Sequence, residues 1–475
     1  MPPPALEDFL NCLRRSGLID EDEAAGLVEG LAKAGVDVRD SKKVAAALVQ
    51  NGTLTKWQAE NLLKGKRRGF VLGKYRLLGL LGRGADSSVY RAEHVLMHRE
   101  CAIKILPAKN LSGTSALDRF QRGARATSKL DHINIVRAYD LGRDKDGKTD
   151  VYFLAMELVD GETFEERVVR EGPLPALAAA DLIRQAAEGL AHAHGNDIIH
   201  RDVKPANLLV DQNGIVKILD LGLAKMSGIL SDDESPILGT ADFLAPEQAL
   251  EAKTVDARSD IYSLGCTFYF LLCGHAPFPG GTLSERLVRH LFEPPVGISQ
   301  RRPNLPDDLT ALVHRLIAKN PDDRVQTMAE LASQLKDWLL QHADKKWLLA
   351  HPSLLGASRS KAGQQREADV DKIESPSNAP TKSPRGAAPT GAPAPKTGAA
   401  TTAVVAPPEA TAPPLPVPTE LVPVMETGSA PAFLSDADFD VPISPVTRSL
   451  MKDRGGRRSW TDWLMRASKK LRGDD

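Results

Sequence analysis

The residues with the clearest chemical potential lie in a polar run at positions 200–207, which reads His-Arg-Asp-Val-Lys-Pro-Ala-Asn. Within it, Asp202 can orient and deprotonate a hydroxyl group, and Lys204 can neutralise charge on a phosphoryl group during transfer. Asn207 can reach a metal ion, and a second oxygen ligand for Mg²⁺, Asp220, follows a short apolar run. This order of residues predicts phosphoryl transfer.

A second group of residues, earlier in the chain, is suited to holding nucleotide phosphates. Residues 81–90 read Leu-Gly-Arg-Gly-Ala-Asp-Ser-Ser-Val-Tyr, and glycines in such a hairpin let backbone N–H groups approach phosphate oxygens. Residues 101–104 form a short apolar strand that ends in Lys104, which can pair with the α- and β-phosphates. Each signal is weak alone, because an ordinary hairpin and a solvent-exposed lysine are the common alternatives.

The elements that must position these residues alternate between strand-like and helix-like stretches over residues 71–342. Residues 151–158 are mostly apolar and are bounded by turn residues, which predicts a buried strand. Residues 181–194 have helical periodicity, with apolar side chains on one face. We expect one two-lobed enzyme domain in this part of the chain.

Taken together and in this order, the motifs make residues 75–342 resemble a eukaryotic-type protein kinase domain. The resemblance implies an α+β, two-lobed protein-kinase fold with ATP and Mg²⁺ between the lobes. The residue at 204 is a lysine, as in Ser/Thr kinases rather than Tyr kinases, so the implied reaction transfers the γ-phosphate of ATP to Ser or Thr of protein substrates. The implied catalytic residues are Asp202, Lys204 and Lys104, the metal ligands are Asn207 and Asp220, and the ATP-binding residues are Leu81, Gly82, Gly84, Val89, Ala102, Lys104, Glu157 and Val159.

The same resemblance assigns an activation segment between Asp220 and the Ala-Pro-Glu sequence at 245–247. Arg201 matches the subgroup of kinases that is controlled by phosphorylation of this segment. Thr240 matches the residue that contacts the catalytic loop in Ser/Thr kinases. A phosphate on one of three serines could pair with Arg201 and order the segment; these are Ser227, Ser231 and Ser235.

Other implied roles are structural or concern the adenine site. Met156 would be the gatekeeper residue next to the hinge. Glu247 should form a buried ion pair with Arg324, and Asp260, at the start of an apolar helix, is also assigned a structural role.

The sequence departs from the family pattern at two positions. Ser87 replaces the third glycine of the phosphate loop, and its Cβ limits backbone freedom, so we expect weaker clamping of ATP. More seriously, Gly123 stands where the family has a glutamate that pairs with the strand lysine, here Lys104. Two interpretations follow: reduced but real catalysis, or a pseudokinase scaffold that binds partners with little or no catalysis.

The flanking regions differ in composition from the central one. Residues 1–70 predict a helical region, and their Gly-Thr-Leu-Thr-Lys-Trp-Gln-Ala stretch resembles serine/threonine kinases of planctomycete-type bacteria. It either packs as a helical domain, the favoured interpretation, or regulates the small lobe. Residues 355–445 are rich in Pro, Ala and Thr, which predicts disorder. Residues 456–473 predict a basic amphipathic helix that docks on a partner, on the kinase domain or, less favoured, on an anionic membrane surface.

Composition sets outer limits on function. The 475-residue chain has a formal net charge of −1, which argues against a dedicated nucleic-acid binder. Its four cysteines form no C-x-x-C pair, which favours a reducing compartment. The first ten residues lack the features of a signal peptide, and the longest apolar run is too short to cross a bilayer. We therefore expect a cytoplasmic protein.

Overall fold

The computed structural model describes residues 4–84, 87–106, 114–146, 149–221, 241–250, 255–351 and 354, without the side chains of 21–25, 114–120, 146 and 149. Four predicted features lie outside the described residues: the disordered 355–445, the helix 456–473, the three candidate phosphorylation serines and Thr240. Within the described part, no helix has both the length and the apolar content needed to cross a membrane.

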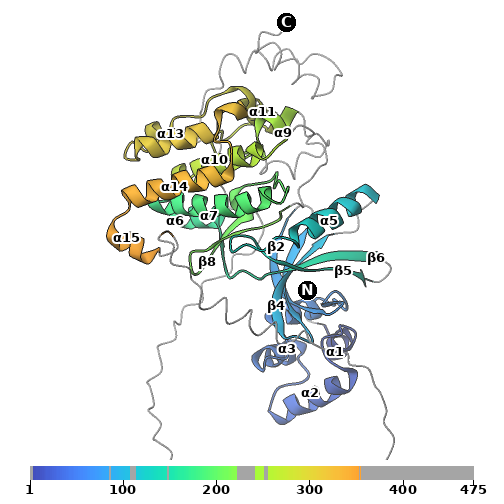
Figure 1. The fold of residues 1–475 in the computed structure, drawn as a ribbon. Coiled ribbons are helices and arrows are strands. Elements are labelled where there is room, and N and C mark those ends of the chain that lie inside the picture. The colour runs from blue at the N-terminus through green and yellow to red at the C-terminus, as the bar shows by residue number, and fades with distance from the viewer. Residues whose placement is uncertain are drawn as a thin grey trace, which may run out of the picture. The chain divides into compact units, whose positions relative to one another are not determined.

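The smaller lobe is built on an antiparallel sheet of six strands in the order β1-β2-β3-β4-β6-β5 (Figure 1). One helix, α5, packs against β5. Side chains of high β-propensity fill the sheet core, including Leu77, Ile103 and Phe153, which are almost completely buried. The elements are β1 (Val71–Leu72), β2 (Tyr75–Arg83), β3 (Ser88–His94), β4 (Arg99–Leu106), α5 (Thr114–Thr127), β5 (Ala138–Asp146) and β6 (Thr149–Met156).

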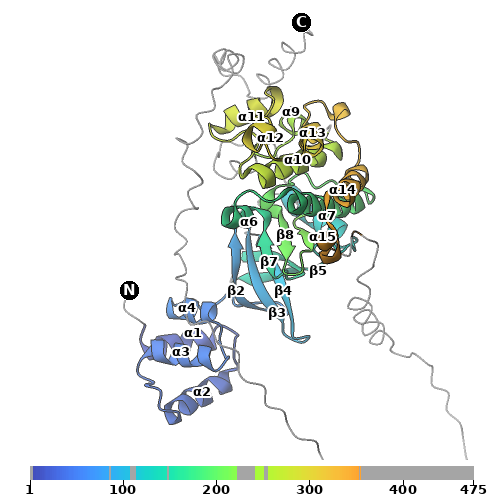
Figure 2. The same cartoon turned by 90° about the vertical axis from the view of Figure 1, so that its left-hand side faces the viewer.

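The larger lobe is mostly helical, with a small sheet, β7-β8-β9, on the side that faces the first lobe (Figure 2). Two long helices dominate it, α7 (Ala176–His194) and α10 (Arg258–Cys273), which pack on each other. Its other elements are β7 (Gly161–Thr163), α6 (Phe164–Glu171), η2 (Pro205–Asn207), β8 (Leu208–Asp211), β9 (Val216–Ile218), α9 (Pro246–Leu250), α11 (Leu283–Phe292), α12 (Ile298–Arg301), α13 (Asp307–Leu316), η3 (Pro321–Asp323), α14 (Met328–His342) and α15 (Lys345–Ala350).

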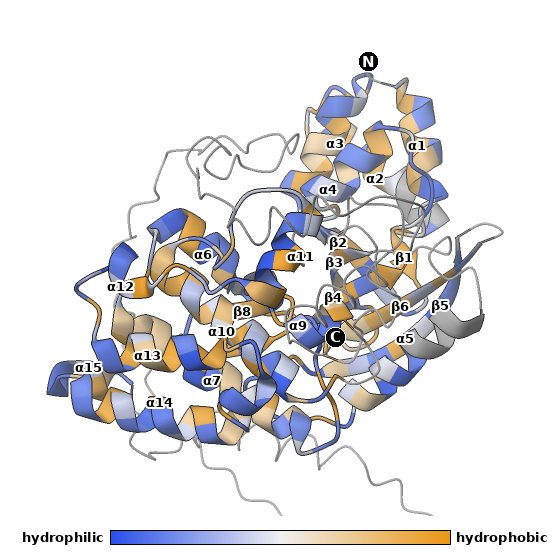
Figure 3. Ribbon diagram, turned by 90° about the horizontal axis from the view of Figure 1, so that it is seen from above, coloured by the Kyte–Doolittle hydropathy of each residue, from blue (hydrophilic) through white to orange (hydrophobic). Residues whose placement is uncertain are grey.

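Hydropathy explains the packing of this lobe. Helix α10 is buried all round, because its apolar run lies between α7 and α13. Its Gly265 permits the close approach of α13, since a Cβ there would lie 2.6 Å from the Leu316 side chain. Outer helices such as α13 and α14 carry both hydrophobic and hydrophilic surfaces in Figure 3, as expected for helices with one face on a core.

The two-lobed α+β fold expected from the sequence is confirmed, and only element ends differ. The predicted strand 151–158 ends at Met156, because the backbone N–H of Glu157 turns to donate to the carbonyl of Arg137 at 2.9 Å. The predicted helix 181–194 starts earlier, at Ala176, directly after Pro175 at the N-cap position.

The N-terminal helices form their own core and are also hydrogen-bonded to the small lobe. Phe9, Val44 and Leu62 are fully buried among α1 (Leu6–Arg14), α3 (Ser41–Gln50) and α4 (Lys56–Leu63); α2 (Glu21–Lys33) completes the group. The start of α4 is closed by a capping box between Thr55 and Gln58.

The capping residues of α4 also bind strand β2. The Thr55 hydroxyl donates to the Leu78 carbonyl at 2.5 Å, and the Gln58 amide donates to the Leu77 carbonyl at 2.7 Å. The pairing of β2 with β3 shifts register between Leu77 and Gly79, so α4 supplies donors at an irregularity in the strand. Trp57 adds edge-on ring contacts with Phe70 and Tyr90.

We predict that Gln58→Ala lowers the free energy of unfolding by about 1–3 kcal/mol, because it leaves the Leu77 carbonyl without this buried donor and removes half of the capping box. Urea unfolding followed by circular dichroism measures the change. The matched control is Glu60→Ala, at an exposed position of the same helix, which should change stability by less than about 0.5 kcal/mol. Equal effects of the two changes would contradict the assigned role of Gln58.

Candidate active site

The loop 200–207 is held by hydrogen bonds to one buried carboxylate. Asp260, at the start of α10, is fully buried, and its Oδ2 accepts from the backbone N–H of His200 at 2.8 Å. Its Oδ1 accepts from the N–H of Arg201 at 2.7 Å, and His194 Nε2 lies 2.8 Å from Oδ2. Arg201 has a φ of 65°, a conformation that non-glycine residues rarely adopt. The Asp260 bonds therefore hold a strained backbone in place.

Asp202 is held by one oxygen and leaves the other without a partner. Its Oδ2 accepts from Asn207 Nδ2 at 2.9 Å and lies 2.9 Å from Lys204 Nζ. Its Oδ1 is buried, and no donor among the described residues reaches it. A buried carboxylate oxygen without a donor is costly. Its position suits an atom that receives the hydrogen of a substrate hydroxyl group.

The two predicted metal ligands are brought together by the β8–β9 hairpin. The N–H of Leu219, next to Asp220, donates to the backbone carbonyl of Asn207 at 2.9 Å. The Asn207 amide nitrogen donates to Asp202, which leaves the amide oxygen available as a ligand. An amide oxygen and a carboxylate are the donors that Mg²⁺ prefers, with phosphate oxygens and water completing its shell. The residues present therefore fit the ion.

Across the described residues, no group of three or more His, Cys, Asp or Glu side chains could hold a metal ion by itself.

Lys104 lies on β4 and forms an ion pair with Asp220, with 2.6 Å between Nζ and Oδ2. Its side chain is only 13% exposed. Burial raises the pKa of Asp220, but the positive charge and hydrogen bond of Lys104, with His200 and Lys204, outweigh it and hold that pKa below its usual value. Lys104 is thus oriented by the metal-binding carboxylate rather than by a residue of α5.

Gly123 lies within α5 and is buried, so the position of the family glutamate is occupied by backbone alone. One turn later, the hydroxyl of Thr127 lies 2.5 Å from the carbonyl oxygen of Leu221, the residue after Asp220, and 3.0 Å from that of Gly123. Helix α5 therefore contacts the metal-binding motif through a neutral hydrogen bond. Sequence reasoning missed this contact, because it depends on how α5 packs.

An apolar cluster lies next to Lys104, where the sequence predicted an adenine site. Ala102, Val136 and Met156 are buried in it. Two of its members, Val136 and Leu219, were not predicted, because each belongs to a short apolar run that no motif marks as part of a binding site. Four partly buried side chains pack against the three: Val89, Leu158, Val159 and Leu219.

The remaining predicted ATP-binding residues lie around this cluster. Leu81 is 52% exposed, and Gly82 pairs with Val89 across the hairpin. The N–H of Gly84 donates to the Ser87 carbonyl at 2.8 Å, closing the phosphate loop despite the loss of the third glycine. At the predicted hinge, the carboxylate of Glu157 pairs with Lys217, with 2.7 Å between Oε1 and Nζ.

The segment that follows the activation region is anchored by an ion pair between Glu247 and Arg324. Two guanidinium nitrogens of Arg324 donate to the two carboxylate oxygens at 2.8 and 2.9 Å, and the Arg324 side chain has no exposed surface. The neighbouring Gln248 amide donates to the carbonyl of Arg201 at 2.9 Å. This anchor therefore reaches the catalytic loop.

A sheet-bearing lobe with a largely buried lysine, next to a helical lobe that presents an Asp-Lys-Asn loop and the carboxylate of Asp220, is the arrangement of a protein kinase. The model of the protein kinase domain family matches residues 75–336, and the chain belongs to this family.

Among characterised relatives, serine/threonine-protein kinase PknB of Mycobacterium leprae is 39% identical over 267 residues, covering 55% of this chain and 42% of the relative. Serine/threonine-protein kinase PrkC of Bacillus subtilis is 33% identical over 320 residues, covering 65% and 48%. The matched region is thus of the bacterial PknB/PrkC type and spans less than half of either relative. The solved kinase domain of PknI from Mycobacterium tuberculosis is 26% identical, with a TM-score of 0.46, covering 57% of this chain and 97% of that one.

We predict that Glu247→Ala lowers the free energy of unfolding by about 3 kcal/mol or more at neutral pH, because it leaves the Arg324 charge buried and unpaired. Burial raises the pKa of Glu247, but the hydrogen bonds and charge of Arg324 and the Ser259 hydroxyl together lower it below its usual value. The stabilisation is therefore complete above the unfolded-state pKa, near 4.5, and is lost as the pH falls through the lower folded-state pKa.

Denaturant unfolding from pH 7 to pH 3 should show the difference between the natural protein and the variant shrinking below about pH 4.5. The control is Asp322→Ala, which removes a 76% exposed carboxylate from its 2.7 Å pair with Arg258 and should cost less than about 1 kcal/mol. A cost for Glu247→Ala no larger than that of the control would refute the anchoring role.

Proposed function

We propose that this chain is an ATP- and Mg²⁺-dependent protein serine/threonine kinase. The observation that carries the proposal is the state of Asp202: one oxygen is fixed by Asn207 and Lys204, and the other is buried without a donor among the described residues. The names of the relatives PknB and PrkC as serine/threonine kinases support the choice of acceptor.

The residues divide the reaction between them. Asp202 Oδ1 accepts the proton of a Ser or Thr hydroxyl group of the substrate. The hydroxyl oxygen bonds to the γ-phosphorus as the bond from the γ-phosphorus to the leaving ADP oxygen breaks. Lys204, beside Asp202, lies where it can neutralise charge on the transferred group. Asn207 and Asp220 would hold Mg²⁺, which when bound neutralises charge on the phosphate oxygens. The apolar cluster at Ala102 and Met156 provides the surface for adenine.

Gly123 sets the expected level of this activity. Because Lys104 binds the carboxylate of Asp220 at 2.6 Å, the lysine and the metal draw on the same group. A glutamate on α5 would remove this conflict, and Gly123 cannot. We infer a kinase with weakened ATP handling. The Thr127 contact to Leu221 supports activity rather than a pseudokinase, because it keeps α5 bonded to the metal-binding motif.

Four further assignments belong to the same proposal. The substrates are proteins, and the place of action is the cytoplasm. The Trp57 region and the motif spellings suggest the planctomycete-type subgroup. Phosphorylation of the activation segment is the proposed control, since Arg201 Nε is buried and has no partner among the described residues.

The test is transfer of labelled phosphate from ATP to the purified chain and to a generic basic protein. We predict that Asp202→Asn, which keeps the shape but loses the base, lowers the rate by about 10²-fold or more. Binding of Mg²⁺–ATP should remain within a few-fold of the natural protein. Equal labelling by the natural protein and the variant indicates a contaminating kinase, and no labelling by the natural protein with ATP binding intact supports the pseudokinase alternative.

Gly123→Glu tests the inferred weakness. We predict a rise in kcat/KM for ATP of about tenfold or more, because a charge-assisted hydrogen bond of roughly 1.5–3 kcal/mol can then hold Lys104 away from Asp220. Gly123→Gln is the matched control, since it gives the same gain in helix propensity and nearly the same size without the charge. A gain shared equally by both variants, or absent from both, would mean that the missing carboxylate does not limit catalysis.

A further inference from the structure

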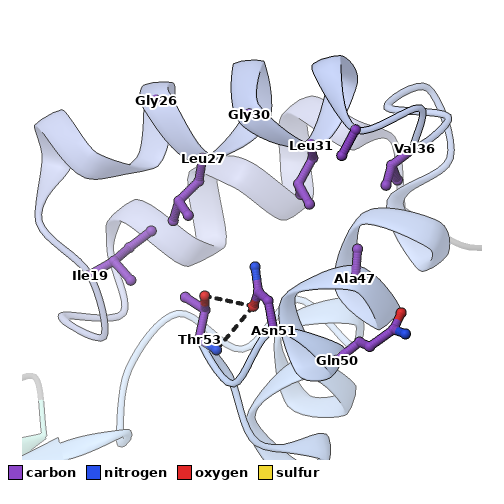
Figure 4. A pocket seen from close by; sticks show the side chains of 11 residues that line it. Ile19, Gly26, Leu27, Gly30, Leu31, Val36, Ala47, Gln50, Asn51 and Thr53 are labelled. Carbon is purple, nitrogen blue, oxygen red and sulfur yellow. Dashed lines mark hydrogen bonds between the residues drawn. The ribbon is translucent and has the colours of Figure 1, made fainter. Parts of the chain in front are cut away.

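The N-terminal helices enclose a groove that the kinase reaction does not use. It has a volume of about 910 Å³ and lies between α2 and α3. Its apolar lining includes Leu27, Leu31, Val36 and Ala47, and Figure 4 shows the leucines projecting from α2 toward the opposite wall. At one end, Asn51 and Thr53 hydrogen-bond to each other at 2.7 Å, so the polar groups there are already paired. We call this feature the α2–α3 groove.

Two glycines form part of the wall, although neither backbone conformation nor packing among the described residues requires glycine there. Gly26 and Gly30 lie inside α2, where glycine costs about 1 kcal/mol each relative to alanine. Neither has a positive φ, and a Cβ built on either would meet nothing within 4 Å. The described packing thus tolerates a side chain at both positions. What the glycines do is keep this wall flat and the groove open.

The sequence contains an apolar segment of matching chemistry at its end. In residues 456–473, one helical face would carry two tryptophans and smaller apolar side chains, while the rest is strongly basic. The first turn of α2, in contrast, contains only acidic charged residues: with its N-cap they are Asp20, Glu21, Asp22 and Glu23.

The chain between the two parts is long enough to join them. Residues 355–455 separate the last described residue from the basic segment. A flexible coil of that length has a root-mean-square span of roughly 55 Å, which exceeds the radius of a domain of this size. Contact within one molecule also gains from a high effective concentration.

We propose that residues 456–473 of this chain dock as an amphipathic helix in the α2–α3 groove, with Trp460 and Trp463 against the flat wall at Gly26 and Gly30. The basic flank then faces the acidic start of α2. The proposal is independent of whether the kinase site is active. It gives residues 456–473 a docking site within the same chain, whereas the sequence alone left a partner protein, the kinase domain and a membrane open for this segment.

The experiment uses the full chain with a photo-crosslinking p-benzoylphenylalanine in place of Trp463. After illumination and proteolysis, mass spectrometry should place most crosslinks within residues 19–53 of the same molecule. Mixing ¹⁴N- and ¹⁵N-labelled chains separates crosslinks within one chain from those between two. Gly26→Leu and Gly30→Leu, made together, should reduce the groove crosslinks at least fivefold.

Controls keep the result interpretable. Ala32→Leu adds a leucine to α2 at an exposed position outside the groove lining without changing the charge, and should leave the crosslinks within twofold. The double glycine variant should not lower Tm, because both side chains enter open space. If it fails to fold, Trp460→Ser supplies the same test from the side of the tail.

Three outcomes would overturn the proposal. Crosslinks could map to the kinase lobes, they could form mainly between copies, or the yield of groove crosslinks could be unchanged both in the double glycine variant and in Trp460→Ser. Flotation with phosphatidylglycerol vesicles provides a fourth. Vesicle binding that needs Trp460, together with no groove crosslinks, would assign the segment to a membrane instead.

Discussion

The buried carboxylate of Asp260 is the constraint on which the active site depends. It accepts hydrogen bonds from two backbone N–H groups of the loop 200–207 and contacts His194. These bonds hold Arg201 in a conformation with positive φ that non-glycine residues rarely adopt. With that backbone fixed, one carboxylate oxygen of Asp202 is hydrogen-bonded and the other has no partner among the described residues. The loop then leads through η2 directly into β8, whose pairing with β9 brings Asp220 to the same place. The loop 200–207 is therefore held in place by a residue of the buried helix α10.

Between the lobes, the contact that α5 makes near Lys104 is weaker than those that hold the loop 200–207. In this chain Lys104 of β4 pairs with Asp220, which follows β9 in the other lobe, and α5 contributes a hydroxyl group in place of a charge. A neutral hydrogen bond is worth less than a charged one. The energy that binds α5 to the metal-binding motif is therefore small, and small changes in the surroundings of α5 can alter it.

The two-lobed fold could be predicted from sequence, because the kinase motifs follow one another in order along residues 75–336. The catalytic and metal-binding roles of Asp202, Asn207 and Asp220 stay predictions. The pairing of Lys104 with Asp220 could not be predicted, since the two residues lie far apart in the chain and come from different lobes. Val136 and Leu219 join the adenine cluster from separate segments, and nothing local distinguishes them from other core residues. The strand through 151–158 was placed correctly but too long at its end, because a single backbone bond to Arg137 sets where it stops.

The attachment of α4 to strand β2 shows that a family boundary and a physical boundary can differ. The family match starts at residue 75, yet the carbonyls of Leu77 and Leu78 find their donors twenty residues upstream, and Trp57 covers Phe70 and Tyr90. A chain that began at residue 75 would start with two carbonyls and an aromatic face uncovered, next to the glycine loop. The hydrogen-bonded unit that contains β2 therefore includes α4, and replacing the N-terminal helices would require new donors for the carbonyls of Leu77 and Leu78.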